Sequence, residues 1–244
     1  MPIFAGLGLL LALGCAIHAG KTGRPFFWIY LCLFLPGIGP LAYLAIEVLP
    51  ELLGTRRGRQ ATSAVARAIN PEKTYRALHE EVETAPTVEN MRRLAEECVA
   101  LGRFSEAIAL YRQCLHGMYA NDPALLLPLA QAQFGASQYA DTRDTLDRLR
   151  TANPDFESAD GHLLYARALE ALGDTAAARR EYEALVAYFP GPEATCRYAL
   201  LLQRIGETQA AATLFAQVKR QLDRAPRHVR AMHREWHQVA TRNA

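Results

Sequence analysis

The sequence predicts an all-α protein that begins with a transmembrane helical hairpin and continues as an α-solenoid of about four helix pairs with a C-terminal capping helix. Three observations predict this fold class. Residues 1–50 carry only three charged side chains and contain two long apolar runs. A basic stretch follows, and the rest of the chain repeats a helix–turn–helix pattern at a nearly constant period. We therefore divide the chain into an anchor at 1–50, a basic juxtamembrane linker at 51–70 and a helical repeat domain at 71–244.

The composition argues against several classes of protein. The chain has 244 residues and a formal net charge of +2, whereas a nucleic-acid-binding protein shows a basic face or tail. The five cysteines are widely spaced and form no C-x-x-C pair, which argues against a disulfide framework or a zinc site and indicates small buried apolar side chains. They are Cys15, Cys32, Cys98, Cys114 and Cys196. We expect no nucleic-acid partner, no metal and no cofactor.

The first apolar run, residues 3–19 (IFAGLGLLLALGCAIHA), has no full charge and is near the lower length limit for crossing a bilayer. A cleavable signal peptide is the alternative. No Lys or Arg precedes the run, however, and a second apolar run follows almost at once. Both features favour a membrane anchor.

The second run, residues 25–50 (PFFWIYLCLFLPGIGPLAYLAIEVLP), is long enough to cross a hydrocarbon core of about 30 Å. Trp28, Tyr30 and Tyr43 are amphipathic rings of the kind that settle near lipid headgroups. A buried core helix is the alternative, but a soluble core rarely needs two such runs separated only by GKTGR. The sequence therefore favours membrane insertion.

Two prolines and two glycines interrupt this second run. Pro36 and Pro40 each remove a backbone donor, while Gly37 and Gly39 let another backbone come close. In lipid, the freed carbonyls must find partners within the protein. We expect that partner to be the first run, through Gly6, Gly8 and Gly14. The result is either a kinked helical hairpin or a spanning helix followed by a re-entrant piece.

This segment resembles the two-helix N-terminal anchor of bacterial cardiolipin synthases, which belong to the phospholipase D superfamily. Over about 40 residues, the apolar stretch that follows a Trp ends in P-x-x-G-P-x-x-Y, with matches at Trp28, Pro36, Gly39, Pro40 and Tyr43. The resemblance implies an inner-membrane anchor in contact with lipid. It does not imply lipid synthesis, because the H-x-K catalytic pattern is absent and His18-Ala-Gly-Lys21 has the wrong spacing.

Positive charge predicts which side of the membrane the repeats occupy. In a hairpin both ends lie on one side, and that side carries Arg56, Arg57, Arg59 and Arg67, whereas the far loop holds two basic residues. The positive-inside rule then favours a cytoplasmic repeat domain. The arginines of residues 54–63 either touch anionic headgroups or serve only as a stop-transfer flank.

The remaining sequence begins with a helical pattern from Pro71 to about Thr84 and then repeats. Four helix–turn–helix units align on turn residues spaced by 35, 36 and 33: Gly102, Ser137, Gly173 and Gly206. A small residue follows each turn by five positions: Ala107, Thr142, Ala178 and Ala211. A bulky residue follows by nine: Tyr111, Leu146, Tyr182 and Phe215. Small residues let two helices approach closely, and large ones fill the groove between neighbours.

From about Val88 to Pro226 these positions resemble the tetratricopeptide repeat (TPR) family, which implies stacked helix pairs that bury a shared core. The second unit departs from the pattern, because its turn is Ala-Ser, its small position is Thr142, and Pro128 lies in its first helix. We expect that pair to be packed more loosely. After Pro226, one capping helix is expected to bury Val229, Met232, Trp236 and Val239 or Ala240.

The TPR resemblance further implies that the first helix of each pair lines a concave groove that binds a protein or peptide. Carried over, the lining positions are Glu89, Arg92, Glu96 and Val99; Ala124, Leu127, Gln131 and Phe134; Asp160, Leu163, Arg167 and Glu170; and Glu193, Cys196, Leu200 and Gln203. The partner-binding residues that we predict among them are Arg92, Glu96, Gln131, Phe134, Arg167, Glu170 and Gln203. The alternative is that each belongs to a solvated helix face.

Catalysis finds little support in the sequence. His228, His233 and His237 follow one another near the C-terminus, but His-Arg-Glu-Trp-His is not the H-E-x-x-H zinc motif. A solvated basic face explains them more simply than a metal site does. P-loop, G-x-S-x-G and Rossmann patterns are also missing, so we predict a protein that is not an enzyme and has no small-molecule substrate.

Three functional hypotheses follow. The first is a membrane-anchored adaptor or scaffold at the bacterial inner membrane, which meets its partner at raised effective concentration. The second is an accessory or regulatory subunit of a membrane enzyme, such as one that acts on phospholipids, associating through the anchor. The third is an enzyme that uses the C-terminal histidines. We predict the first.

Overall fold

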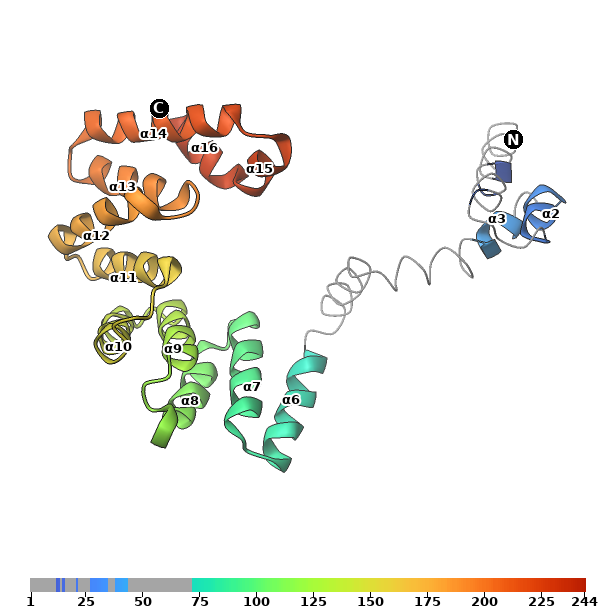
Figure 1. Ribbon diagram of the computed structural model, residues 1–244, viewed down its shortest axis with the longest axis horizontal. Coiled ribbons are helices and arrows are strands. Elements are labelled where there is room, and N and C mark those ends of the chain that lie inside the picture. Colours follow the sequence, from blue (N-terminus) through green and yellow to red (C-terminus); the bar gives the residue numbers. More distant parts are fainter. Residues whose placement is uncertain (1–11, 14, 16–20, 22–26, 35–37, 44–71) are drawn as a thin grey trace. The chain divides into compact units, whose positions relative to one another are not determined.

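The structure is a computed structural model that describes residues 12, 13, 15, 21, 27–34, 38–43 and 72–244 (Figure 1). The chain divides into two compact units, residues 1–73 and 74–244. The predicted linker at 51–70, the first apolar run apart from three of its residues, and the anchor residues Pro36 and Gly37 lie outside the described part.

In the N-terminal unit, α2 (Phe27–Phe34) and α3 (Ile38–Tyr43) pack directly against each other. A Cβ on Gly39 would overlap the backbone carbonyl of Leu31, so the glycine allows α3 to approach α2. The sequence predicts a close approach at Gly39, but with the first apolar run as the partner. The structure shows a contact within the second run, whereas Gly6, Gly8 and Gly14 of the first run lie outside the described residues.

Aromatic rings and cysteines form the small core of this unit. Trp28 and Tyr43 meet edge to face with centroids 5.5 Å apart, and Cys15 and Cys32 are buried beside them. Trp28 and Tyr43 are therefore buried in this unit, and Tyr30 is the exposed ring of the three that the sequence analysis places near headgroups. None of the helices in the described residues combines the length and the apolar character needed to cross a membrane.

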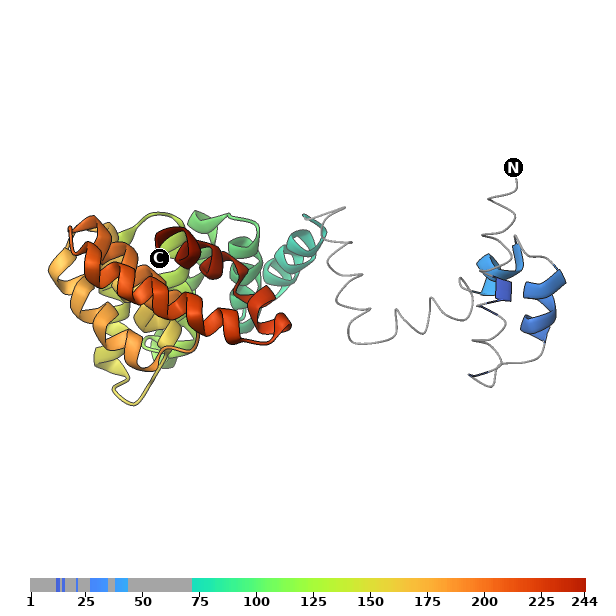
Figure 2. The same cartoon turned by 90° about the horizontal axis from the view of Figure 1, so that it is seen from above.

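The second unit is a stack of helices joined by short turns (Figures 1 and 2). Its first helix is α6 (Glu72–Thr84), whose Leu78 is buried and whose Tyr75 and Val82 pack on the first pair. The pairs are α7 (Val88–Ala100) with α8 (Phe104–Cys114), α9 (Pro123–Gly135) with α10 (Tyr139–Ala152), α11 (Ala159–Ala171) with α12 (Thr175–Tyr188), and α13 (Glu193–Arg204) with α14 (Thr208–Arg224). A 3₁₀ turn, η2 (Gly117–Tyr119), lies between α8 and α9.

The four turn residues have left-handed backbone conformations, which confirms the predicted register. The φ angles of Gly102, Ser137, Gly173 and Gly206 are 74°, 60°, 82° and 87°. In each turn the next residue's N–H returns to a carbonyl of the first helix, for example Arg103 to Cys98 at 2.8 Å and Gln138 to Gln133 at 2.8 Å. Such bonds satisfy carbonyls at the helix end and set the angle at which the second helix begins.

The small and bulky positions predicted from the repeat spacing are all buried. The small ones are Ala107, Thr142, Ala178 and Ala211, and the bulky ones are Tyr111, Leu146, Tyr182 and Phe215. Thr142 donates its hydroxyl to the carbonyl of Gln138 at 2.9 Å, so its polar atom is satisfied within its own helix. The second pair therefore keeps the same buried positions as the others despite its Thr.

Pro128 lies inside the first helix of the second pair, as the sequence predicts, whereas the cap differs from the prediction. Helix α9 continues through Pro128, and Leu125, Leu126 and Leu129 around it are buried. The cap consists of two helices, α15 (Arg227–Met232) and α16 (Arg234–Asn243), which meet at His233. Because of this break, Met232 is 75% exposed, whereas Trp236, Val239 and Ala240 of α16 pack on α13 and α14. In Figures 1 and 2, α16 lies beside α14.

Candidate functional site

The first-helix face is the surface formed by α7, α9, α11 and α13 at the positions predicted to contact a partner. At its centre, two predicted residues from neighbouring pairs meet. The guanidinium of Arg167 on α11 lies 4.5 Å from the ring centroid of Phe134 on α9. The Phe134 ring also meets Tyr139 edge to face, with centroids 5.2 Å apart. These contacts hold the Phe134 ring in place with the guanidinium of Arg167 stacked on it. The side chains of Phe134 and Arg167 are both half-buried.

Arg167 has no carboxylate close enough to balance its charge. Within residues 72–244 it forms no ion pair and no hydrogen bond, although Glu170 and Glu193 are near enough to exert a weak opposing influence. Burial, followed by repulsion from Arg197, lowers the pKa of Arg167. A guanidinium stays charged under all ordinary conditions, so the face carries an uncompensated, partly desolvated positive charge.

A second cation lies beside it that sequence reasoning did not select. Arg197 on α13 donates from Nε to Glu193 at 2.8 Å, and its guanidinium lies 5.0 Å from the ring centroid of Trp236 on α16. The spacing of Glu193 and Arg197 by four residues was the available signal for the ion pair. The stacking on Trp236 depends on where α16 docks, and the repeat pattern does not determine that.

Glu170 and Gln203, which are also among the predicted partner-binding residues, already contact polar side chains of the protein. Glu170 accepts the hydroxyl of buried Tyr182 at 2.5 Å and pairs with Arg204. Burial, together with this bond to a carboxylate, raises the pKa of Tyr182. Gln203 is exposed, and its amide lies 3.5 Å from the side-chain oxygen of Asn243. Glu170 therefore has a structural role that limits its availability to a ligand.

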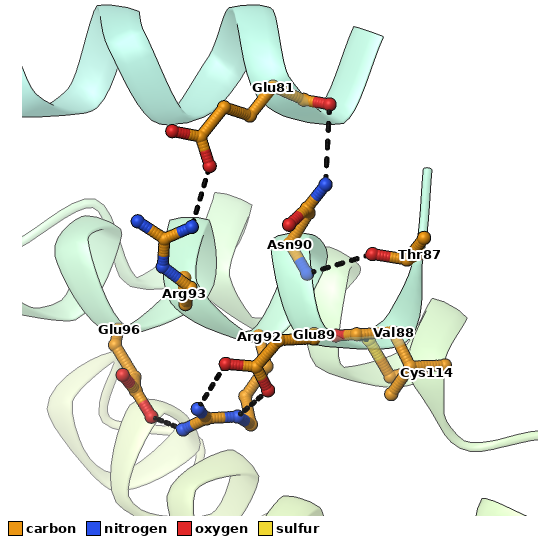
Figure 3. Close-up of polar contacts among 9 residues, drawn as sticks. All are labelled: Glu81, Thr87, Val88, Glu89, Asn90, Arg92, Arg93, Glu96 and Cys114. Atoms are coloured by element: carbon orange, nitrogen blue, oxygen red, sulfur yellow. Dashed lines mark hydrogen bonds and ion pairs between the residues drawn. The ribbon is translucent and has the colours of Figure 1, made fainter. Parts of the chain in front are cut away.

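At the α7 end of the face, Arg92 and Glu96 neutralise each other within one helix (Figure 3). Arg92 donates to Glu89 through Nε at 3.0 Å and Nη2 at 2.8 Å, and it also pairs with Glu96. The figure shows Arg93 reaching Glu81 of α6 nearby, at 2.6 Å. This end is consequently polar but close to neutral.

Three further positions predicted to line the groove differ in their exposure to solvent. Gln131 is exposed and, within the described repeat unit, forms no hydrogen bond, so its amide faces solvent. Leu163 and Cys196 are buried and do not belong to the surface, contrary to the carried-over pattern. Cys196 is buried because α16 covers it, and its thiol lies 3.8 Å from the carbonyl of Trp236.

The C-terminal histidines do not form a metal site in the structure. His237 lies 2.8 Å from Asp223 of α14, and hydrogen bonds from Lys219 and His237 lower the pKa of Asp223 to about 2. Among the described residues, no group of three or more His, Cys, Asp or Glu side chains is arranged to hold a metal ion. His237 therefore belongs to a surface network of hydrogen bonds with Asp223 and Lys219.

Comparison with known proteins identifies the repeats. Two family models described as tetratricopeptide repeat match residues 99–168 and 160–192. No curated protein sequence matches the chain. Among solved structures, MamA is 16% identical with a TM-score of 0.52, covering 78% of this chain and 94% of its own. A MamA fragment from Desulfovibrio magneticus RS-1 is 17% identical with a TM-score of 0.56, covering 66% and 90%.

A third similar structure is YrrB, described as a TPR protein with an unusual peptide-binding site. It is 16% identical with a TM-score of 0.50 and covers 68% of this chain and 88% of its own. Identities this low show the shared fold alone. They support the repeat architecture and assign no role to the residues of the first-helix face.

Proposed function

Because residues 99–192 carry tetratricopeptide repeats, we propose that this chain is a membrane-anchored adaptor whose first-helix face binds a segment of a partner protein. The observation that carries the proposal is the half-buried Arg167 stacked on Phe134 without a counter-ion. A charge held in this way is costly unless something pairs with it. A carboxylate on a bound segment would supply the missing partner.

The surroundings of Arg167 suit such a segment. The Phe134 ring offers apolar contact, and the guanidinium offers a planar set of donors that matches a carboxylate. The exposed amides of Gln131 on α9 and Gln203 on α13 belong to the first helices before and after α11, where they suit hydrogen bonds to a peptide backbone. Arg92, Glu96 and Glu170 contribute less, because each is already paired within the protein.

Membrane attachment is part of the same proposal. Phe27, Tyr30, Leu33 and Phe34 on α2 are between 57% and 77% exposed, which is unusual for large apolar side chains in contact with water. Together with the apolar composition of residues 1–50, this supports an anchor in the inner membrane, in contact with lipid. The arginines that follow favour a cytoplasmic position for the repeats. The anchor would raise the effective concentration of a partner in the same membrane.

Co-purification from native membranes in mild detergent tests the adaptor role. The wild type is compared with the Phe134→Ala, Arg167→Ala double variant, and Arg180→Ala, an exposed arginine on α12, is the matched control. We expect a partner that is retained by the wild type and the control and is lost from the double variant. Recovery of the same proteins with all three would show that the first-helix face is not the binding surface.

The exposed apolar side chains of α2 also favour a second candidate, an accessory subunit that joins a membrane enzyme through the anchor. Residues 1–60 fused to a reporter would then recover the partner without the repeats. Under the adaptor proposal, the same fusion reaches the membrane but recovers no partner.

A further inference from the structure

A cavity of about 780 Å³ lies between α10, α11 and α12, away from the first-helix face. Leu146 and Leu149 form its α10 wall, and Phe156, Tyr165 and Tyr188 add aromatic surface. Phe156 and Tyr188 are 40% and 53% exposed, so the cavity opens to solvent at an apolar rim. Its volume falls within the range of known ligand sites.

The cavity and the first-helix face lie on opposite sides of α11. Tyr165 lines the cavity and Arg167 lies on the first-helix face. At 3.6 residues per turn, positions two apart point to nearly opposite sides of a helix. His162 lines the cavity on the same side as Tyr165. A ligand in the cavity would therefore not compete for Arg167.

The polar lining of the cavity is negative. Arg150 is paired with Asp147 at 2.9 Å and its guanidinium lies 5.3 Å from the ring centroid of Tyr165, so the carboxylates of Glu157 and Glu181 outnumber the one guanidinium in the lining. Glu181 accepts a bond from Nε2 of His162 at 2.6 Å, and the Tyr188 hydroxyl lies 2.5 Å from Nδ1 of the same ring. The histidine thereby holds Glu181 in place against the cavity.

Both phenols in the lining respond to this negative charge. Burial, followed by the charges of Glu181 and Glu157, raises the pKa of Tyr188. Burial and a hydrogen bond with Asp147 raise the pKa of Tyr165; the charge of Arg150 opposes this increase, and the charge of Glu181 adds to it. The negative charges of Glu157 and Glu181 therefore influence side chains that line the cavity.

We propose that this cavity binds a basic, partly apolar segment of a protein, with an Arg or Lys side chain at Glu181 and apolar side chains against Leu146, Leu149 and Phe156. Apolar walls with opposite charge at one point select such a segment by charge complementarity. The open rim at Phe156 and Tyr188 lets a longer chain continue past the site. The inference is independent of the proposed function, since it concerns the other side of α11.

The test uses the full chain in detergent and a fluorescein-labelled peptide with the core Leu-Arg-Phe-Arg-Leu, followed by fluorescence anisotropy up to about 1 mM protein. Two matched peptides carry Gln or Glu in place of both Arg residues. The variants are Glu181→Gln, which keeps the acceptor for His162, and Ala159→Phe, which fills the cavity. Glu183→Gln on the exposed side of α12 and Arg167→Ala are the controls. Thermal unfolding checks that each variant is folded.

We expect the Arg peptide to bind at least about tenfold more tightly than the Gln peptide, and the Glu peptide not to bind at this site. Glu181→Gln and Ala159→Phe should each weaken the Arg peptide about tenfold, while Glu183→Gln and Arg167→Ala leave it unchanged. Failure of the Arg peptide to bind, equal binding of the Gln peptide, or equal loss in Glu181→Gln and Glu183→Gln would overturn the proposal. Loss only in Arg167→Ala would place the peptide on the first-helix face and also overturn it.

Discussion

Arg167 carries the charge on which recognition at the first-helix face depends, and the contacts around it suggest function more than stability. It stacks on Phe134 but has no acid partner among residues 72–244. A residue that is held in an unfavourable environment is expected to cost stability that a replacement would recover. A ligand carboxylate would make the same environment favourable.

The first prediction follows from that contrast. Arg167→Met keeps a flexible side chain against the Phe134 ring and removes the unpaired charge. We expect the free energy of unfolding in urea to equal the wild-type value or to exceed it by up to about 1 kcal/mol, while partner binding is lost. A loss of stability greater than about 1 kcal/mol would show that Arg167 is structural.

The turn residues support a second prediction, in which two substitutions act in opposite directions. Gly173 has a φ of 82° and Ser137 a φ of 60°, and a Cβ on Gly173 would meet no other atom. Gly173→Ala is therefore expected to cost about 1–2 kcal/mol through backbone strain alone. Ser137→Gly relieves the same strain and should stabilise the protein by a few tenths of a kcal/mol. Thermal unfolding measures both, and shifts of the same sign would contradict this explanation.

At the scale of the helix pair, stability depends on the close approach that the small residues allow. Ala178 is fully buried between helices, whereas Ala184 on the same helix α12 is exposed. We predict that Ala178→Leu lowers the free energy of unfolding by about 1–3 kcal/mol, because the added atoms force the helices apart. Ala184→Leu should change it by less than about 0.5 kcal/mol. Equal effects in chemical denaturation would mean that the pair is not tightly packed at Ala178.

The sequence predicted the parts of each pair that depend on local chemistry. A left-handed turn requires Gly or a tolerant residue, and a close helix contact requires a small one. Both requirements recur at the predicted spacing. The break of the cap at His233 was not predicted, because tertiary packing decides it. The same reason explains the missed stacking of Arg197 on Trp236, whose partners lie 39 residues apart (236 − 197).

The candidate site was predicted less completely than the fold. The resemblance to tetratricopeptide repeats placed Phe134 and Arg167 on the same face, and the structure brings them into contact. It did not show that Arg92, Glu96 and Glu170 are already paired, because ion pairs depend on rotamers and on neighbouring helices. The cavity between α10, α11 and α12 left no sequence signal, since its walls come from three helices and a loop.

At the scale of the whole repeat unit, buried thiols and a hydrogen-bonded tyrosine hydroxyl make the stability of the fold decrease at alkaline pH. Burial raises the pKa of Cys98 and Cys196 to about 12, and a hydrogen bond with Glu106 raises the pKa of Tyr75 to about 12. The ordinary pKa is 9.0 for a cysteine thiol and 10.0 for a tyrosine hydroxyl. The protonated forms are favoured by folding, so this stability is fully present below pH 9.0 and is lost as the pH rises towards 12.

We therefore predict that the free energy of unfolding, measured in urea, falls steadily as the pH rises above about 9. The Cys98→Ala, Cys196→Ala double variant should show a shallower decrease, because two of the groups responsible are removed. A slope that is identical in the wild type and the variant would contradict the assignment to these thiols.

The most direct measurement of the central claim is site-specific photocrosslinking in native membranes. A photoreactive side chain is placed at Gln131 or Gln203, which are exposed on the first-helix face, or at Arg180 on the exposed side of α12. If the first-helix face binds the partner, Gln131 and Gln203 give the same crosslinked protein, Arg180 does not, and Arg167→Ala abolishes the crosslink. Crosslinking from Arg180 alone, or from all three positions equally and regardless of Arg167, would contradict the proposed adaptor function.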